Sequence, residues 1–140
     1  MPDVRVLGFD YGAKRIGVAV GQTLMGTASA LTQLSAQKGK PEVRAVQALL
    51  DEWRPDALIV GLPLNMDDSP SKSSKAAQRF ASWLETEFKL PVYLVDERLS
   101  SREARDRLDQ PGKKYTKTEL NSMAAQVIVE GWLMSQHSRG

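Results

Sequence analysis

Asp10 is the first residue whose place in the sequence suggests chemistry, because it ends an apolar run and lies between two glycines. The run at residues 4–9 has the composition of a strand. Gly8 and Gly12 flank the acid, and glycine is used where a backbone or a ligand must approach closely. The same acid could instead only hydrogen-bond the turn at 11–14, since aspartate is common in turns.

Two later segments also carry polar side chains directly after an apolar run of strand length. The runs are residues 57–62 and 91–95, and the groups that follow them are Asn65, Asp67, Asp68, Asp96 and Glu97. In open α/β sheets, ligands bind beyond the carboxyl ends of the parallel strands. We therefore expect these groups to meet Asp10 at one edge of a sheet.

Clustered carboxylates at such an edge predict bound divalent cations, because carboxylates repel one another unless they are protonated or neutralised. The chain has no cysteine, and its one histidine, His137, lies three residues from the C-terminus. Any metal must therefore have oxygen ligands, which favours Mg²⁺ or Mn²⁺. Two such ions about 3.5–4 Å apart can activate water and stabilise the leaving oxygen of a phosphodiester.

Asp10 and Glu97 are the metal ligands that this pattern predicts, with Asp10 bridging the ions and Glu97 binding one or both. Asp96 alternates with Glu97 along the strand, so only one of the two can point to the site, and we choose Glu97. Glu97 could instead form a salt bridge with Arg98 or help to begin the next helix.

Basic side chains near these acids predict contacts with a phosphate backbone. Between residues 98 and 117, seven cations outnumber three acids, although the net charge of the whole chain is only +2. Part of this segment is equally well explained as a solvent-exposed helix face with i,i+4 ion pairs. The predicted contacts to nucleic acid are Lys14, Arg15, Asn65, Arg98, Arg102, Lys113 and Lys114.

The elements that must position these groups alternate between strands and helices after an initial meander. Strands are expected at 4–10, 16–20, 26–31, 57–62 and 91–95, helices at 41–53, 72–88, 100–108 and 116–135, and loops at 33–40 and 109–115. Capping boxes at 100–103 and 116–119 mark two helix starts. The runs at 57–62 and 91–95 are typical of strands buried on both faces. The order β-β-β-α-β-α-β-α-α predicts an α/β fold in which residues 1–140 form a single domain around a mixed five-stranded sheet, with helices on both faces.

Four segments carry a resemblance to a known family: GFDYGAKRIGVAV, VGLPLNMDDS, VDERLSS and LNSMAAQVIVEGWL. Together they are similar, in order and over nearly the whole chain, to the YqgF (RuvX) family of pre-16S rRNA nucleases, which is related to Holliday-junction resolvases. The resemblance implies an RNase H-like fold and a divalent-metal nuclease of the bacterial cytoplasm that matures the 16S rRNA 5′ end. The family's acids fall on Asp10 and Glu97, and a third position falls on Asn121.

Two positions depart from the family pattern. The family usually has aspartate where this chain has Asn121, and a neutral carbonyl oxygen is a weaker Mg²⁺ ligand. Glu119 lies about 200° around the helix from Asn121, so it is a poor substitute. The family loop usually reads NMDGS, whereas here Asp68 stands in place of the glycine. Asp67 or Asp68 could supply the missing charge, but we favour a stiffer turn.

Other function classes remain open from the sequence. The chain could resolve branched DNA, which normally requires a dimer. Because of Asn121, it could also bind RNA, a ribosome precursor or the transcription machinery without hydrolysing anything. An actin-like or sugar-kinase ATPase also uses a D-x-G turn, but it closes two such domains over ATP and 140 residues supply one. With no signal-type segment and no apolar window of about 18 residues, we expect a cytoplasmic protein.

Overall fold

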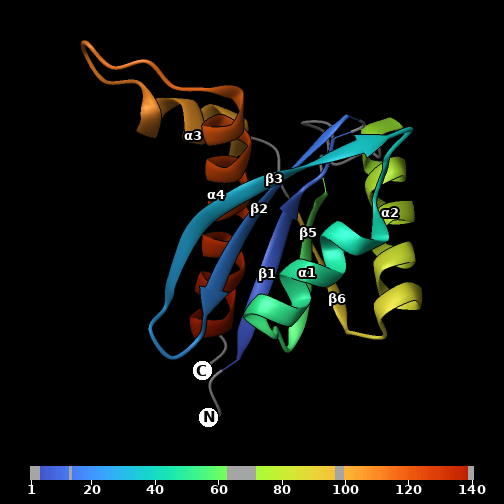
Figure 1. The fold of residues 1–140 in the computed structure, drawn as a ribbon. Helices are drawn as coiled ribbons and strands as arrows, with labels where there is room; N and C mark the ends of the chain where they lie inside the picture. Colours follow the sequence, from blue (N-terminus) through green and yellow to red (C-terminus); the bar gives the residue numbers. More distant parts are fainter. Residues whose placement is uncertain (1–3, 13, 63–71, 97–99, 139–140) are drawn as a thin grey trace.

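The structure is a computed structural model that describes residues 4–12, 14–62, 72–96 and 100–138, and these form a mixed α/β fold with a six-stranded sheet (Figure 1). The strands are β1 Arg5–Asp10, β2 Arg15–Gln22, β3 Thr27–Gln37, β4 Lys40–Pro41, β5 Ala57–Leu62 and β6 Val92–Asp96. The helices are α1 Val43–Trp53, α2 Lys72–Phe88, α3 Ser100–Leu108 and α4 Lys117–Ser138.

The strands lie in the order β4-β3-β2-β1-β5-β6. β1, β2 and β3 form the expected antiparallel meander, and β5 is parallel to both β1 and β6. The carboxyl ends of β1, β5 and β6 therefore share one edge of the sheet, as the sequence predicted. The expected α/β class with a mixed sheet is confirmed, and the expected count of five strands is wrong.

The sixth strand arises where a loop was predicted at 33–40. β3 continues to Gln37, because its polar residues form a backbone ladder with β2, in which Ser35 pairs with Arg15 and the Ala36 amide donates to the Lys14 carbonyl at 2.8 Å. A turn then leads into β4, so Pro41 lies in a strand and not in the first turn of α1, which begins at Val43.

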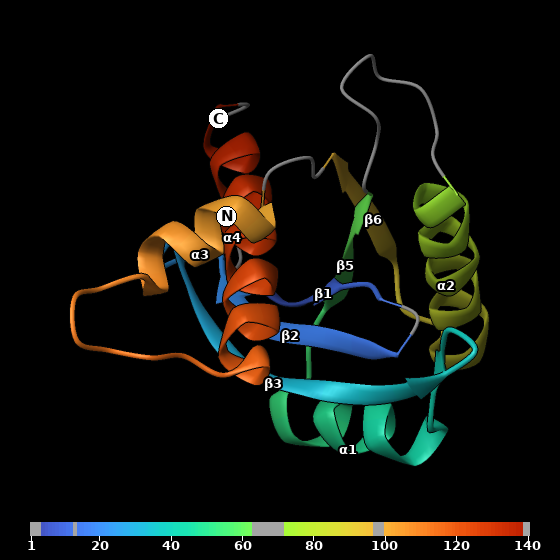
Figure 2. The ribbon, with the colours of Figure 1, turned by 90° about the horizontal axis from the view of Figure 1, so that it is seen from above.

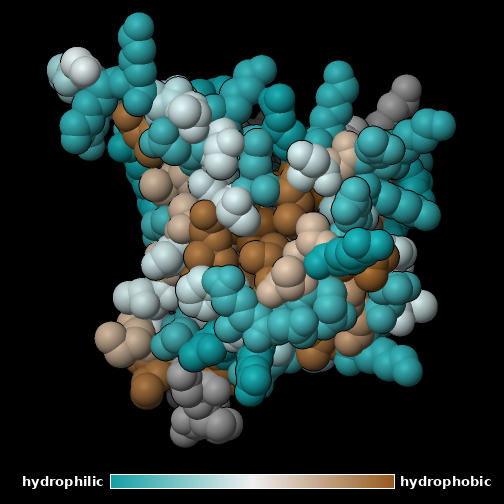
Figure 3. All heavy atoms as spheres, in the orientation of Figure 1, coloured by the Kyte–Doolittle hydropathy of each residue, from teal (hydrophilic) through white to brown (hydrophobic). Residues whose placement is uncertain are grey.

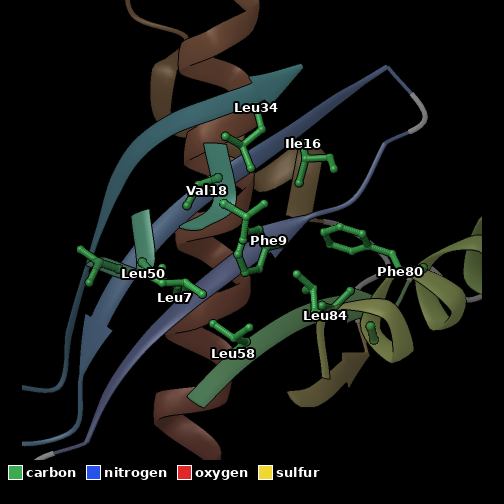
Figure 4. Close-up of a cluster of buried hydrophobic side chains, with 14 residues drawn as sticks. Leu7, Phe9, Ile16, Val18, Leu34, Leu50, Leu58, Phe80 and Leu84 are labelled. Carbon is green, nitrogen blue, oxygen red and sulfur yellow. The ribbon is translucent and has the colours of Figure 1, made fainter. Parts of the chain in front are cut away.

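Two apolar cores cover the two faces of the sheet. Leu7 and Phe9 of β1 pack with side chains of α1 and α2, in the cluster drawn in Figure 4. Val6 of β1 and Ala19 of β2 pack against α4 on the other face. Figure 2 shows α1 and α4 on opposite sides of the strands. Because successive side chains of a strand alternate between faces, Asp10 lies on the α4 face with Val6.

β6 is an edge strand, and the prediction that it is buried on both faces is wrong. Tyr93 and Leu94 are 47% and 46% exposed, because β6 pairs with β5 alone. The same prediction holds for β5, where Ala57, Leu58, Ile59 and Val60 are buried between two neighbouring strands. Among the described residues, no helix is both long enough and apolar enough to cross a membrane.

Candidate functional site

α4 begins with the capping box that the sequence predicted. The Glu119 amide donates to the Thr116 hydroxyl oxygen at 3.1 Å, and the Thr116 amide donates to a carboxylate oxygen of Glu119 at 3.3 Å. These bonds satisfy amides that a helix start leaves unpaired. Because the Glu119 carboxylate is used in this cap, it does not substitute for the acid expected at Asn121.

A row of three residues crosses β1, β2 and β3 on the α4 face. Gly17 pairs with Asp10 on one side and with Gln33 on the other. Directly paired residues of neighbouring strands point to the same face. Asp10 and Gln33 therefore flank Gly17 on the α4 face. Because glycine has no side chain, a space is left between them on that face of the sheet.

α4 fills that space with the backbone of Asn121. A methyl group at Gly17 would overlap the Asn121 carbonyl, so the close approach of the helix to the sheet requires glycine here. The side-chain amide of Asn121 donates to Oε1 of Gln33 at 2.9 Å. The structure thus brings Asp10, Asn121 and Gln33 together around one glycine.

Gln33 is the residue of this site that sequence reasoning missed. A plain hairpin from the turn between β2 and β3 pairs Gln22 with Thr27, and that register would place Thr32 opposite Gly17. A bulge between Val18 and Ala19 shifts the register by one residue, which brings Gln33 to the position instead. Because a one-residue slip moves a side chain to the other face, only the bulge brings Gln33 to Asn121.

The structure also distinguishes between the two acids at the end of β6. Asp96 and Leu94 share a face of the strand, and Leu94 pairs with Val60, whose side chain lies in the α1–α2 core. Asp96 therefore lies on the face opposite Asp10, which supports the choice of Glu97 over Asp96. Glu97 itself, like Asn65, Asp67, Asp68 and Arg98, lies outside the described residues.

The donors around Gly17 have the chemistry that a hard divalent cation requires. Asp10 offers carboxylate oxygens, and Asn121 and Gln33 offer amide oxygens, which are ligands suited to Mg²⁺ and Mn²⁺. Within the described ranges, no group of three or more acids or histidines lies close enough together to hold a metal. The donor set of the described residues therefore fits such an ion in type, but it contributes a single negative charge.

The predicted basic contacts that the structure describes are all exposed and lie on two sides of this site. Arg15 is the first residue of β2, Lys14 directly precedes it beside the end of β1, and Arg102 lies on α3. Lys113 and Lys114 lie in the connection between α3 and α4. Figures 1 and 2 both show this connection reaching away from the sheet, on the side opposite α2.

Arg107 ties α3, the basic helix, to α4. Its guanidinium donates to Glu130 of α4 at 2.7 Å and to Glu103 of its own helix at 3.0 Å. The hydrogen bond to Glu130 raises the pKa of Arg107. Partial burial would raise the pKa of Glu130, but hydrogen bonds from Arg107 and Gln126 outweigh it, so that pKa is lowered. Arg107 therefore has a structural role, in agreement with the alternative interpretation of this segment as a helix face with i,i+4 ion pairs.

Comparison with known sequences finds close relatives over nearly the whole chain. The sequence model of the RuvX family, described as Holliday junction resolvase, matches residues 4–135. A Pseudomonas fluorescens (strain Pf0-1) protein named "Putative pre-16S rRNA nuclease" is 49% identical over 131 residues, which cover 91% of this chain and 90% of the relative. A Pseudomonas putida protein of the same name is 47% identical over 137 residues, with 95% and 97% covered.

Comparison with solved structures finds resolvases of the same fold. Thermus thermophilus RuvC superimposes with a TM-score of 0.53 at 14% identity, covering 96% of each chain. The yeast mitochondrial Holliday junction resolvase Ydc2 superimposes with a TM-score of 0.54 at 10% identity, covering 96% of this chain and 79% of the other. At such low identity the likeness concerns the fold, and it agrees with the RNase H-like expectation.

Proposed function

This chain belongs to the RuvX family, and we propose that it is a nuclease that hydrolyses phosphodiester bonds in structured nucleic acid. The substrate we infer is precursor 16S rRNA, cleaved during maturation of the 5′ end, since relatives at 47–49% identity are named for that activity. The protein then acts in the cytoplasm, as a single domain, on ribosome precursors.

The observation that carries this proposal is the meeting of β1 and α4 at Gly17. In it, the acid at the end of a parallel strand lies beside the position of α4 at which the resemblance implies the family's third acid. If Asp10 served only to stabilise the local turn, α4 would not need to pack against Gly17, the residue that pairs with Asp10. The arrangement therefore favours the functional interpretation of Asp10 over the local turn.

Asp10 and Glu97 are the residues that would hold Mg²⁺ or Mn²⁺, and Asn121 would offer a neutral oxygen. Bound there, such ions activate a water molecule and stabilise the leaving oxygen of the phosphodiester. The protein's own groups bind and orient the strand. In this proposal Lys14 and Arg15 bind backbone phosphates next to Asp10, and Asn65, Arg98, Arg102, Lys113 and Lys114 extend the contact on either side.

A non-catalytic role in binding RNA or the transcription machinery is the second candidate, and the Asn121–Gln33 pair favours it. In that pair two neutral amides are hydrogen-bonded to each other, so position 121 contributes no charge that would attract a cation. Resolution of branched DNA is a third possibility, supported by the family description and by the resolvase fold.

Cleavage of precursor 16S rRNA and of a four-way DNA junction by the wild type and by Asp10→Asn, with Mn²⁺, tests these possibilities. Loss of the Asp10 carboxylate should lower the cleavage rate at least about 100-fold, on the scale seen when a group that stabilises transition-state charge is removed. Asp96→Asn is the matched control, since that acid lies on the opposite face, and its rate should stay within about twofold. Equal residual cleavage by the wild type and by Asp10→Asn would refute the nuclease proposal and favour the non-catalytic binding role.

A further inference from the structure

A hollow of about 130 Å³ lies beside the end of β1, on the face of the sheet opposite Asp10. Its walls come from three segments that are far apart in the sequence: Tyr11, the turn between β3 and β4, and α2. Figures 1 and 2 both show the β3–β4 turn next to α2. Figure 3 shows hydrophilic side chains gathered at that place, beside an apolar area over the middle of the sheet.

The charged side chains that line the hollow are all cations among the described residues: Lys38 and Lys40 from the turn, and Arg79 from α2. All three are exposed, and none of them forms an ion pair with another described residue. Three cations that have no acidic partner in the described part of the chain surround one small hollow, and they create a field that attracts an anion.

Aromatic rings form the floor between these cations. The Tyr11 and Phe80 rings lie 5.0 Å apart between centroids, and Trp83 stacks on Phe80 at 6.0 Å with an interplanar angle of 25°. Phe80 is buried, whereas Tyr11 and Trp83 are only half-buried. The hollow therefore combines cations with partly exposed ring surfaces, as in sites that bind unpaired nucleic-acid strands.

The turn that carries Lys38 and Lys40 is fixed to this floor. Lys38 and Gly39 have φ values of 51° and 82°, the two positive values that a two-residue hairpin turn of the I′ type requires. The Tyr11 hydroxyl donates to the Gly39 carbonyl at 3.3 Å, and a methyl group at Gly39 would overlap that hydroxyl. The two lysines are thus held on either side of the tip of Tyr11.

We propose that this hollow binds an unpaired stretch of nucleic-acid strand. One backbone phosphate lies between Lys38, Lys40 and Arg79, and a neighbouring base packs on the ring of Tyr11 or Trp83. The volume is well below the roughly 300–1,000 Å³ of pockets that enclose a whole small-molecule ligand, and it suits a single phosphate group. The inference rests on the proposed function in one respect, namely that the strand held here continues to Asp10.

The position of the hollow explains how one strand could reach both places. Tyr11 follows Asp10 directly and points to the opposite face, so a strand that crosses the end of β1 passes from the hollow to the acid within a few nucleotides. Lys14 and Arg15 are also exposed and lie where the connection from β1 enters β2, so further cations lie next to this path.

Binding of a labelled single-stranded oligoribonucleotide, measured by fluorescence anisotropy with EDTA over a range of salt concentrations, tests the inference. The double variant Lys38→Asn, Arg79→Gln removes two cations while asparagine keeps the turn. Its matched control is Lys89→Asn, Arg44→Gln, since Lys89 is also an exposed lysine at positive φ and Arg44 is an exposed helical arginine.

Each phosphate contact that is lost should lower the slope of log K against log salt by about 0.7 for a single strand. The Lys38–Arg79 variant should therefore lose about 1.4 of slope and at least about tenfold in affinity at low salt, while the control keeps the wild-type slope. Equal effects in both variants, or no measurable binding by the wild type, would overturn the proposal.

Trp83→Leu tests the role of the ring, with a duplex of the same sequence as the second ligand. Loss of one base stack should weaken single-strand binding about 5- to 150-fold and leave duplex binding unchanged. A similar loss of affinity for both ligands would show that the surface attracts nucleic acid by charge alone, and it would refute the proposal that the hollow binds an unpaired strand. If Trp83→Leu does not fold, Tyr11→Leu provides the same comparison.

Asp10→Asn separates this inference from the proposed nuclease function. The variant keeps the hollow and removes a negative charge from the path of the strand, so it should bind the single strand at least as tightly as the wild type does. A protein that cleaves nothing but shows the difference between the two double variants would refute the nuclease and support the hollow. A protein whose cleavage depends on Asp10 but which shows no such difference would support the nuclease and refute the hollow as a binding site.

Discussion

The side-chain amide nitrogen of Asn121 lies 2.9 Å from Oε1 of Gln33, which is 88 positions away in the chain. The bond joins the first turns of α4 to β3, and it links two neutral side chains. It fixes the orientation of Asn121, because the nitrogen of that side chain faces Gln33 and its oxygen is left for other partners.

Asn121→Asp should strengthen Mn²⁺ binding at least about tenfold. A second carboxylate near Asp10 adds a full charge to the cation site, and one charge pair about 4 Å apart contributes on the order of 4 kcal/mol near a protein surface. Repulsion between the two carboxylates offsets part of this gain. Titration calorimetry with Mn²⁺ measures the affinity directly.

The same variant should melt at a lower temperature than the wild type in EDTA and gain more stability from added Mn²⁺, because a ligand stabilises the state that binds it. The double variant Asp10→Asn, Asn121→Asp is the control, since it has the wild-type charge at the site and should not gain affinity. Unchanged affinity in the single variant would show that position 121 does not contribute to cation binding.

Gly17→Ala should destabilise the protein by about 2 kcal/mol or more, because its methyl group overlaps the Asn121 carbonyl and overpacking typically costs about 1–3 kcal/mol. It should also weaken Mn²⁺ binding, since α4 must move away from Asp10.

Gly131→Ala is the matched control in α4. A methyl group there meets nothing, and replacing an exposed helical glycine should stabilise by about 0.5–1 kcal/mol. Urea unfolding compares both, and similar losses would contradict the close approach at Gly17.

Local signals in the sequence were sufficient where an element is defined by its own residues. The predicted helix at 72–88 coincides with α2, and the capping box at 116–119 is formed as expected. Both depend on side chains within a few positions of each other. β3 was underestimated because its second half has polar side chains and is held by backbone pairing with β2, which hydropathy does not record.

The candidate site was predictable only as far as it depends on strand ends. Alternation along β6 predicted that only one of Asp96 and Glu97 can face the site, and the strand order predicted that Asp10 lies at the carboxyl edge of the parallel strands, where the structure has it. Gln33 could not be placed, because a one-residue bulge between Val18 and Ala19 decides which side chain faces Asn121. Nor did composition distinguish Arg107, whose pairing with Glu130 requires α3 and α4 to be packed together.

Glu130→Gln should lower the free energy of unfolding by about 0.5–1 kcal/mol at pH 7, the upper part of the range measured for exposed ion pairs. Hydrogen bonds from Arg107 and Gln126 lower the pKa of Glu130, so the wild type's advantage is complete above the ordinary glutamate pKa of 4.5 and is lost as the pH falls through the lower pKa of the folded state. Urea unfolding from pH 7 to pH 3 should show that the unfolding free energies of the two proteins converge at the acid end.

Glu103→Gln removes only the pair within α3 and should cost less, about 0.3–0.5 kcal/mol. A Glu130→Gln deficit that persists unchanged at pH 3 would mean that packing of the side chain, and not its charge, connects α3 to α4.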